Sequence, residues 1–331
     1  MASFSKFGAE TDANEVLAAF PNAVEGKIVL ITGVSPNGLG AALARSLAPH
    51  KPKLLILAGR TSAKVEAVSK EIVTSNPGIE VRTVLFDISS FASIAKGVEE
   101  INGYAEPNID IVFNNAGVMN IPERRLSADG FEMQLATNYL GLALFTMSIL
   151  PKIKQSAAGR IVNVVSNGYA ISPFRFSDYN FDGNDLPEDE QPSKAACEAF
   201  GVPWGLGYIP PVAYGQSKTA GILFTRELAH RLTGTNVTAV CVNPGVVATD
   251  LWREMPPQTV DAIMSALPPK SPTQGVSTML VAALDPKLKE SPGAYLEDCQ
   301  IAEVQPFAKD KAKGERLWKL TERLTGNTFS V

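Results

Sequence analysis

Short apolar runs alternate with longer amphipathic stretches along most of this chain. Each run is rich in β-branched residues and apolar at successive positions, as in strands that are buried on both faces of a sheet. The predicted strands are KIVLIT at 27–32, KLLILA at 53–58, EVRTVLF at 80–86, IDIVFN at 109–114, GRIVNVVS at 159–166 and NVTAVCVNPG at 236–245. Helices are predicted between them, at 39–49, 61–75, 90–102, 128–150 and around YGQSK at 214–218. This alternation predicts an α/β fold, a Rossmann-type doubly wound parallel sheet in a single domain.

The predicted domain spans 27–305, with an N-terminal extension at 1–26 and a helical tail at 306–331. No repeat of fixed period and no Gly/Ser-rich linker divides it. One long region without a predicted strand, 167–213, is rich in proline, glycine and aromatic residues. Loops of this length inside a domain are usually functional or disordered, so we interpret it as an insertion with a role of its own.

Two aromatic segments flank an acidic one inside this insertion. YAISPFRF and FGVPWGLGYIPP carry aromatic side chains, whereas LPEDEQPSK at 186–194 is polar. We expect the aromatic ends to be ordered at the rim of a binding pocket, where Phe174 and Trp204 select the ligand, and the acidic middle to face solvent. The residues expected to border an apolar, bulky ligand are Tyr169, Phe174, Phe176, Trp204, Tyr208, Trp252 and Met255.

Composition and charge argue against several classes of protein. With 331 residues and 45% hydrophobic content the chain can bury a large core, and a net charge of −4 with scattered Lys and Arg offers no basic face to nucleic acid or an anionic membrane. Cys197, Cys241 and Cys299 are odd in number and lack C-x-x-C spacing, so we expect reduced thiols. The sequence has only two histidines, His50 and His230, so few residues are available for a zinc site or a Ser-His-Asp triad, and no metal is predicted.

The N-terminus has Glu and Asp where a signal peptide would be apolar, so we expect a cytoplasmic protein. The longest apolar stretch, YLGLALFTMSIL at 139–150, is shorter than the roughly 20 residues that span a bilayer. It predicts a buried helix and no membrane span.

A glycine-rich loop follows the first predicted strand and leads into a helix. TGVSPNGLG at 32–40 places Gly33, Gly38 and Gly40 in this loop. A turn that needs a positive φ would explain one glycine, whereas three at a strand-loop-helix junction indicate a backbone that approaches a pyrophosphate beside the positive end of a helix. The other contacts expected on this loop are Ser35, Asn37 and Leu39.

The end of the second predicted strand indicates which dinucleotide is bound. Sites that prefer NAD place an acid there for the ribose hydroxyls, but this chain has Ala58 and Gly59, followed by Arg60 and then Lys64. A 2′-phosphate would meet positive charge, so the predicted cofactor is NADP(H); the alternative is that Arg60 is a solvated surface residue. Asp87, at the end of the third strand, is expected either to contact adenine or to cap the next helix.

Six short motifs occur in a fixed order along the chain. They are TGVSPNGLG, NNAG at 114–117, TNYLG at 137–141, RIVNVVS at 160–166, YGQSK and NPGVVAT at 243–249. In this order and spacing, over about 27–300, the chain resembles the short-chain dehydrogenase/reductase family. SPFRFSDYNF, YGQSKTA and GAYLEDCQ are most similar to its retinol-dehydrogenase-like branch.

The resemblance implies four catalytic residues. Tyr214 is the general acid/base, Lys218 its electrostatic partner and a ribose ligand, Ser166 the donor to the carbonyl oxygen, and Asn138 the residue that holds a proton-relay water. The i, i+4 spacing alone would also fit an exposed pair on one helix face. Because a free tyrosine has a pKa near 10, holding its anion at neutral pH needs roughly 4 kcal/mol, about what an ammonium some 4 to 5 Å away supplies at an effective dielectric near 20.

The resemblance also implies cofactor contacts and shows two departures from the family pattern. Asn115 and Gly117 are expected on the adenosine side, and the nicotinamide side is expected to hold Pro244, Gly245, Val247 and Thr249. The glycine loop has one more residue between its first two glycines than is common, which leaves its contacts less defined. Val165 stands where the family commonly has a second serine.

The predicted function is an NADPH-dependent carbonyl reductase, or in reverse a secondary-alcohol dehydrogenase, for an apolar ketone or alcohol. One alternative is a non-catalytic NADP-sensing binding protein, which would be expected to lose the tyrosine or the lysine. Another is an epimerase or dehydratase on the same fold, which needs longer C-terminal machinery. The sequence leaves the substrate, and the question of a homodimer, open.

Overall fold

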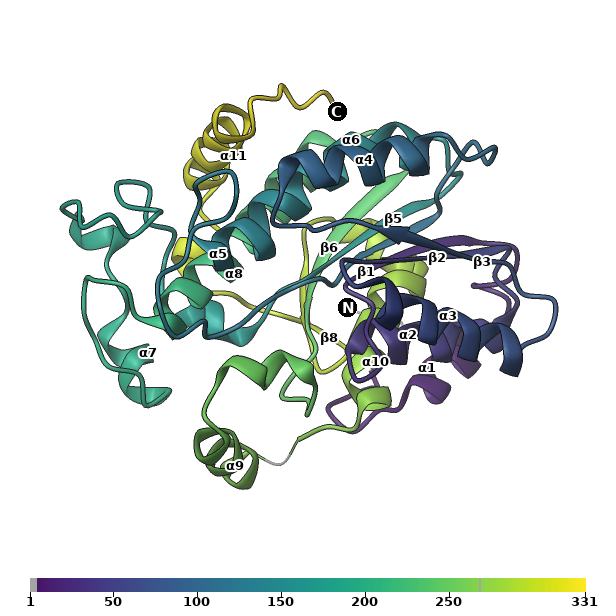
Figure 1. Cartoon of the computed structure of the whole chain (residues 1–331), viewed down its shortest axis with the longest axis horizontal. Coiled ribbons are helices and arrows are strands. Elements are labelled where there is room, and N and C mark those ends of the chain that lie inside the picture. Colours follow the sequence, from purple (N-terminus) through teal and green to yellow (C-terminus); the bar gives the residue numbers. More distant parts are fainter. Residues whose placement is uncertain (1–4, 268) are drawn as a thin grey trace.

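The computed structural model describes residues 5–267 and 269–331, and at its centre is one eight-stranded sheet (Figure 1). The strand order is β3-β2-β1-β4-β5-β6-β7-β8, and all neighbours are parallel except β7 and β8. The strands are β1 (Ile28–Thr32), β2 (Leu54–Gly59), β3 (Val81–Leu85), β4 (Ile111–Asn114), β5 (Gly159–Val164), β6 (Val237–Asn243), β7 (Tyr295–Glu297) and β8 (Gln300–Ala302). Because the strand order reverses between β1 and β4, the predicted doubly wound α/β sheet is confirmed.

The last two strands were not predicted. Each has three residues, too few to show a hydrophobic period, and Asp298 and Cys299 between them have positive φ angles of 49° and 62°. This tight turn folds β8 back on β7 as an antiparallel edge, so the sheet extends past the six predicted strands.

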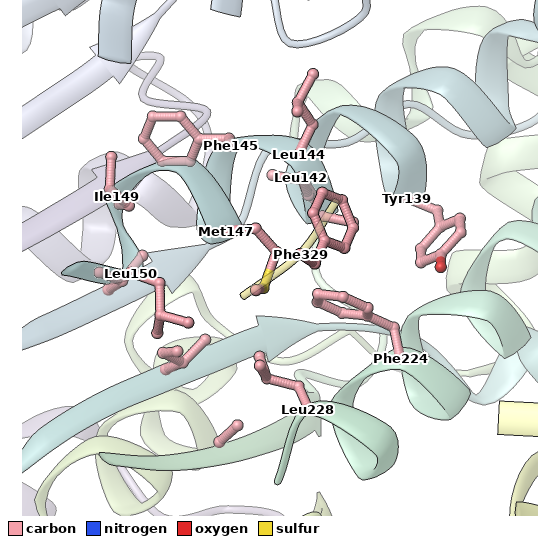
Figure 2. Close-up of a cluster of buried hydrophobic side chains, with 14 of the residues drawn as sticks. Tyr139, Leu142, Leu144, Phe145, Met147, Ile149, Leu150, Phe224, Leu228 and Phe329 are labelled. Atoms are coloured by element: carbon pink, nitrogen blue, oxygen red, sulfur yellow. The ribbon is translucent and has the colours of Figure 1, made fainter. Parts of the chain in front are cut away.

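Helices cover both faces of the sheet. One face carries α1 (Ala13–Ala19), α2 (Leu39–Leu47), α3 (Ser62–Ser75) and α10 (Pro272–Leu284). The other carries α4 (Phe91–Asn102), α6 (Gly141–Lys154), α8 (Pro210–Arg231) and α11 (Lys311–Thr325). Figure 2 shows the core of this second face, where the Tyr139 and Phe224 rings lie 5.9 Å apart, edge to face.

The two ends of the chain pack into these cores. α1 buries Val16 and Leu17 in the first core, against α10. α11 lies along α8, and the Trp318 ring stacks on the Phe224 ring with 5.6 Å between centroids. Both segments therefore bury apolar surface of the sheet's helices.

The long apolar stretch around 139–150 belongs to a continuous helical segment, Met133–Lys154. Its first turns are α5 (Met133–Leu135) and a π-helical turn at Ala136–Leu140, and α6 follows. By length and composition alone this segment could cross a membrane, but 89% of its most apolar window is buried inside the protein. It is the central helix of the second core, in agreement with the predicted buried helix.

Candidate active site

A cavity of about 810 Å³ lies at the carboxyl ends of the parallel strands, where the strand order reverses. The predicted residues on its wall are Gly33, Ser35, Gly38, Leu39, Arg60, Lys64, Asp87, Asn115, Gly117, Ser166, Tyr214, Lys218, Pro244, Gly245, Val247 and Thr249. Asn37 is not on the wall, because its side chain points to Asp250 and donates from Nδ2 to Oδ1 at 3.4 Å. Asn138 lies behind the wall. The structure thus brings most of the predicted site to one place.

The glycine loop packs closely on the segment after β4. Gly33 has a φ of +73°, and a Cβ there would lie 2.5 Å from the Cα of Ala116. A Cβ on Gly40 would lie 2.8 Å from the Gly33 carbonyl oxygen and 2.9 Å from Asn115 Nδ2. α2 begins after Gly38, whose position offers no side-chain cap, so the first N–H groups of the helix face the cavity without an internal partner. This geometry fits a bound pyrophosphate.

Two basic side chains stand beside the glycine loop. Arg60 Nη1 lies 4.0 Å from Asp87 Oδ2, and Lys64 Nζ lies 3.9 Å from Asp250 Oδ2. The side chains of Arg60 and Lys64 are 62% and 54% exposed, so a phosphate can reach both without displacing buried contacts. Asp87 also accepts from the Ser89 N–H and hydroxyl, at 2.9 and 2.7 Å.

The predicted catalytic hydroxyls meet at the centre of the cavity. Tyr214 is on the first turns of α8, and Ser166 follows β5 and caps the short 3-10 helix Asn167–Ile171. Both side chains lie on the cavity wall, and Ser166 is close enough to influence the pKa of the Tyr214 phenol. Burial raises the pKa of Tyr214 to about 12, against the smaller lowering effect of Ser166. The phenol therefore carries its proton at neutral pH.

Lys218 lies one helical turn after Tyr214, on the same face of α8. Its Nζ donates to the Val164 carbonyl oxygen at 3.0 Å and lies 5.4 Å from the centre of the Tyr214 ring. Burial lowers the pKa of Lys218 to about 8. The spacing of the two residues indicates only the attraction between their charges; in the structure, burial of the phenol is the largest effect on the pKa of Tyr214.

Asn138 lies on the π-helical turn, directly behind the catalytic residues. Its Oδ1 accepts from the Val118 N–H at 2.8 Å, and its Nδ2 donates to the Val118 carbonyl oxygen and the Ser217 hydroxyl at 2.9 and 3.0 Å. Such π turns are frequent at functional sites. Asn138 thereby joins the loop after β4 to α8, between Tyr214 and Lys218.

Comparison with known proteins agrees with this geometry. The family model described as short chain dehydrogenase matches residues 27–180 and 205–259. The chain belongs to this family. Retinol dehydrogenase 12 from Mus musculus is 36% identical over 305 residues, covering 92% of this chain and 87% of the relative, and oxidoreductase fscI from Fusarium equiseti is 40% identical over 244 residues, covering 72% and 94%.

Solved structures show the same fold. An uncharacterized protein from Mycobacterium paratuberculosis has a TM-score of 0.70 and 25% identity, covering 97% of this chain and all of that chain. L-sorbose reductase from Gluconobacter frateurii, solved with NADPH and L-sorbose, has a TM-score of 0.61 and 16% identity, covering 86% of this chain and all of that chain. This short-chain dehydrogenase is thus an oxidoreductase acting on CH–OH groups of a small molecule with a nicotinamide cofactor, in the retinol-dehydrogenase-like branch.

The aromatic residues of the insertion that were predicted to border the cavity do not line it. Phe174 and Phe176 do not reach the cavity; their rings meet at 4.8 Å and are buried in the second core. Tyr169 packs edge-on against Tyr295, 5.8 Å between ring centres. Trp204 is 42% exposed and donates to the Pro192 carbonyl oxygen instead of lining the cavity.

Tyr208 is also directed elsewhere, whereas two other predicted residues do border the cavity. The Tyr208 hydroxyl donates to the Ile121 carbonyl oxygen at 2.9 Å. Trp252 and Met255, which follow β6, are both on the wall. The expectation that Phe174 and Trp204 border the ligand is therefore wrong in its residues. The predicted aromatic end FGVPWGLGYIPP does reach the cavity, through Phe200, Gly201, Val202 and Pro203.

The acidic middle of the insertion faces solvent only in part. Glu190 is 2% exposed, accepts from the Ser177 N–H at 2.7 Å and pairs with Arg316 at 3.2 Å. Asp189 pairs with Lys313 at 2.8 Å. Lys313 and Arg316 of the helical tail therefore form ion pairs with this acidic segment.

Several wall residues were not predicted. They come from the end of the segment after β4 and from α9 (Pro257–Ala266) with the residue after it: Val118, Met119, Asn120, Thr259, Ile263, Ala266 and Leu267. Val118, Met119 and Asn120 directly follow NNAG, so the position of that motif at a strand end could have indicated them. α9 has no buried residue, so its hydrophobic pattern gives little indication that it borders the cavity.

Proposed function

We propose that this short-chain dehydrogenase reduces a ketone with NADPH, or oxidises the corresponding secondary alcohol with NADP⁺. The observation that carries the proposal is the convergence of Ser166, Tyr214 and Lys218 on the cavity that also holds the glycine loop. Arg60 and Lys64 supply positive charge where a 2′-phosphate would lie. When bound, the cofactor supplies the hydride for the carbonyl carbon and, once oxidised, a positive charge beside the tyrosine.

The protein's own residues handle the proton. Tyr214 keeps its proton at neutral pH and would donate it to a carbonyl oxygen bound beside the phenol and the Ser166 hydroxyl, which are both on the cavity wall. Lys218, held by the Val164 carbonyl oxygen, stabilises the phenolate that remains. Asn138 is hydrogen-bonded to Val118 in the loop after β4 and to Ser217 on α8. It thereby holds this loop against the helix that carries Tyr214 and Lys218.

The substrate side of the cavity favours an apolar ketone or alcohol. The outer residues of the insertion, Trp252, Met255 and α9 form most of this side, and they offer few polar groups besides the catalytic hydroxyls. Relatives named retinol dehydrogenases support the same class of compound. The test is NADPH oxidation across a panel of apolar and polar ketones, aldehydes and quinones, with NADH as the matched cofactor. If no ketone in the panel is reduced with either cofactor, the proposal is wrong.

The cofactor choice can be tested at Arg60. A charge-assisted hydrogen bond to a phosphate contributes roughly 1.5–3 kcal/mol, so Arg60→Ala should weaken NADPH binding about 10- to 100-fold. NADH has no 2′-phosphate, so its affinity should stay nearly unchanged. Fluorescence titration with each cofactor measures both values, and an equal loss for the two would contradict the assignment.

The pH dependence of reduction follows from Lys218. The lysine is charged below its pKa of about 8 and becomes neutral above it, whereas Tyr214 stays protonated through this range. We expect kcat/KM for ketone reduction to be flat below about pH 8 and to fall by up to about tenfold per pH unit above it. A profile between pH 6 and 10, corrected for NADPH stability, measures this, and a rise across pH 8 to 10 would contradict the role given to Lys218.

A further inference from the structure

Residues 199–203, here called the outer wall, close the substrate side of the cavity from the insertion. They lie outside the two ranges that match the family model, 27–180 and 205–259. Phe200 within the wall is 46% exposed, whereas Val202 packs against a small buried cluster that contains Ile171 and Cys197. The position of the wall therefore depends on this contact and on how the chain is attached on either side of it.

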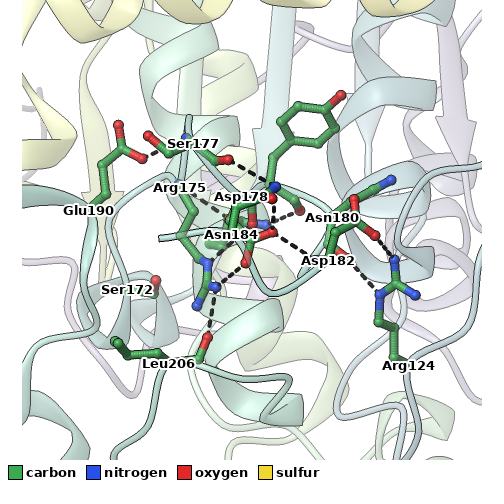
Figure 3. Close-up of polar contacts among 12 residues, drawn as sticks. Arg124, Ser172, Arg175, Ser177, Asp178, Asn180, Asp182, Asn184, Glu190 and Leu206 are labelled. Carbon is green, nitrogen blue, oxygen red and sulfur yellow. Dashed lines mark hydrogen bonds and ion pairs between the residues drawn. The ribbon is translucent and has the colours of Figure 1, made fainter. Parts of the chain in front are cut away.

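Contacts on both sides attach the wall, including the hydrogen bond from Trp204 Nε1 to the Pro192 carbonyl oxygen at 2.9 Å. Before it, the Ser193 N–H donates to the Ile171 carbonyl oxygen at 2.9 Å, at the start of α7 (Lys194–Ala199). After it, the Leu206 carbonyl oxygen accepts from Arg175 Nη2 at 2.8 Å. Figure 3 shows Arg175 pointing to Leu206 from the inner part of the insertion.

Arg175 is fully buried, and its contacts fix it in one orientation. Its Nη2 also donates to Asp178 Oδ2 at 2.7 Å, and its guanidinium lies 4.0 Å from the centre of the Phe181 ring. Asp178 Oδ1 in turn accepts from the Asp182 N–H at 2.7 Å (Figure 3). A buried ion pair of this kind contributes little net stability, and the best-attested use of such groups is to specify one arrangement.

The same residue is tied to the catalytic helix. The Arg175 N–H donates to Gln216 Oε1 at 3.2 Å, and Gln216 Nε2 donates to the Tyr179 carbonyl oxygen at 2.9 Å. Gln216 is buried on α8 between Tyr214 and Lys218. A continuous set of hydrogen bonds thus runs from the catalytic helix through Arg175 to the end of the outer wall.

We propose that Arg175 is a positioning residue that sets the outer wall against the catalytic helix and so determines which substrates fit. The proposal rests on the proposed ketone reduction and adds the residue that controls its specificity. Arg175 touches neither the cavity nor the catalytic hydroxyls, so it acts on the substrate indirectly, through the wall. Large substrates, which reach the wall, depend on it; small ones, which lie against the catalytic hydroxyls, do not.

The test variant replaces both charges, Arg175→Met with Asp178→Asn. Removing the arginine alone would leave a buried carboxylate without its partner, whereas removing both charges of such a pair is often close to neutral for stability. We expect kcat/KM for a bulky apolar ketone to fall about 10- to 100-fold through a higher KM, because small misplacements far from the chemistry have effects of this size. kcat for a small ketone and the NADPH affinity should stay within about twofold.

Limited trypsin digestion tests the tether without any substrate. Lys194 lies at the start of α7 beside the wall, with its Nζ 4.7 Å from the centre of the Trp204 ring. Freeing the wall should speed cleavage after Lys194 about tenfold, since exposed mobile loops are the preferred sites of nicking. Gln216→Met, which breaks the link to α8 and leaves the ion pair, should show the same two effects at smaller size.

The matched control is Arg124→Met with Asp182→Asn. Arg124 pairs with Asp182 and donates to the Asn180 carbonyl oxygen at 2.7 Å, so it joins the same insertion but has no link to Leu206 (Figure 3). This control should match the unaltered protein in selectivity and in cleavage. Unchanged selectivity and unchanged cleavage in the Arg175/Asp178 variant would overturn the proposal. If the unaltered protein reduces no ketone, the proposed function fails, and the digestion still decides whether Arg175 tethers the wall.

Discussion

Replacing Tyr214 by phenylalanine should lower turnover by at least about 100-fold while NADPH still binds. The change removes only the hydroxyl that donates the proton, and general acid catalysis contributes about 10²- to 10⁴-fold. The ring stays in place, because it is buried at the cavity wall and the change leaves its packing intact. Single-turnover and steady-state NADPH oxidation with a ketone that the unaltered protein reduces measure the loss.

A nearby tyrosine provides the control for this change. Tyr169 is three residues after Ser166, is equally buried, and uses its hydroxyl to accept from the Gln305 N–H at 3.0 Å, away from the cavity. Tyr169→Phe should cost about 1 kcal/mol of unfolding free energy, as for other lost hydrogen bonds, and leave turnover within about threefold. Near-normal turnover in Tyr214→Phe, or an equal loss in both variants, would show that the phenol of Tyr214 is not the proton donor.

The parallel part of the fold could be predicted because its signal is local. Each of β1 to β6 is a run of apolar, β-branched residues, and the helices between them have the lengths that crossover connections need. β7 and β8 could not be found this way, since their three-residue length carries no period and their pairing depends on the turn at Asp298 and Cys299. The edge of the sheet is set by tertiary contacts of β6 with β7.

The candidate site divides in the same way. Gly33, Ser166, Tyr214 and Lys218 lie at strand ends or on one helix face, so the sheet topology alone brings them together. No comparable rule predicts where the side chains of the insertion lie. An aromatic residue there can fill a core, as Phe174 does, or border a cavity, and composition does not separate these outcomes.

The pKa values of Tyr214 and Lys218 could not be predicted from the sequence, for a different reason. The spacing of Tyr214 and Lys218 fixes their attraction, but the pKa of each also depends on burial, which a sequence does not show. In the structure, burial raises the pKa of the phenol and lowers that of the lysine. The pair is therefore arranged as a proton donor beside a cation for carbonyl reduction at neutral pH, and the phenolate forms only as the proton leaves.

The glycine loop gives the second large effect, at Gly33. Its φ of +73° is unfavourable for any residue with a Cβ, and a Cβ there would meet the Cα of Ala116 at 2.5 Å. A left-handed conformation costs about 1–2 kcal/mol for alanine, and overpacking typically adds about 1–3 kcal/mol. Gly33→Ala should therefore lower the free energy of unfolding by about 3 kcal/mol or more. It should also weaken NADPH binding by at least about tenfold. The loop must move away from Ala116, and its backbone N–H groups then no longer point toward the phosphates.

Gly26 allows the two contributions to be separated. It has the same φ of +73° but no atom within 4 Å of the position its Cβ would take, and it is remote from the cavity. Gly26→Ala should therefore show the conformational cost alone, about 1–2 kcal/mol, with NADPH affinity unchanged. Urea unfolding and cofactor titration of both variants give the comparison. If the two variants lost equal stability and both bound NADPH normally, the contact between Gly33 and the segment after β4 would not be what holds the phosphate loop in place.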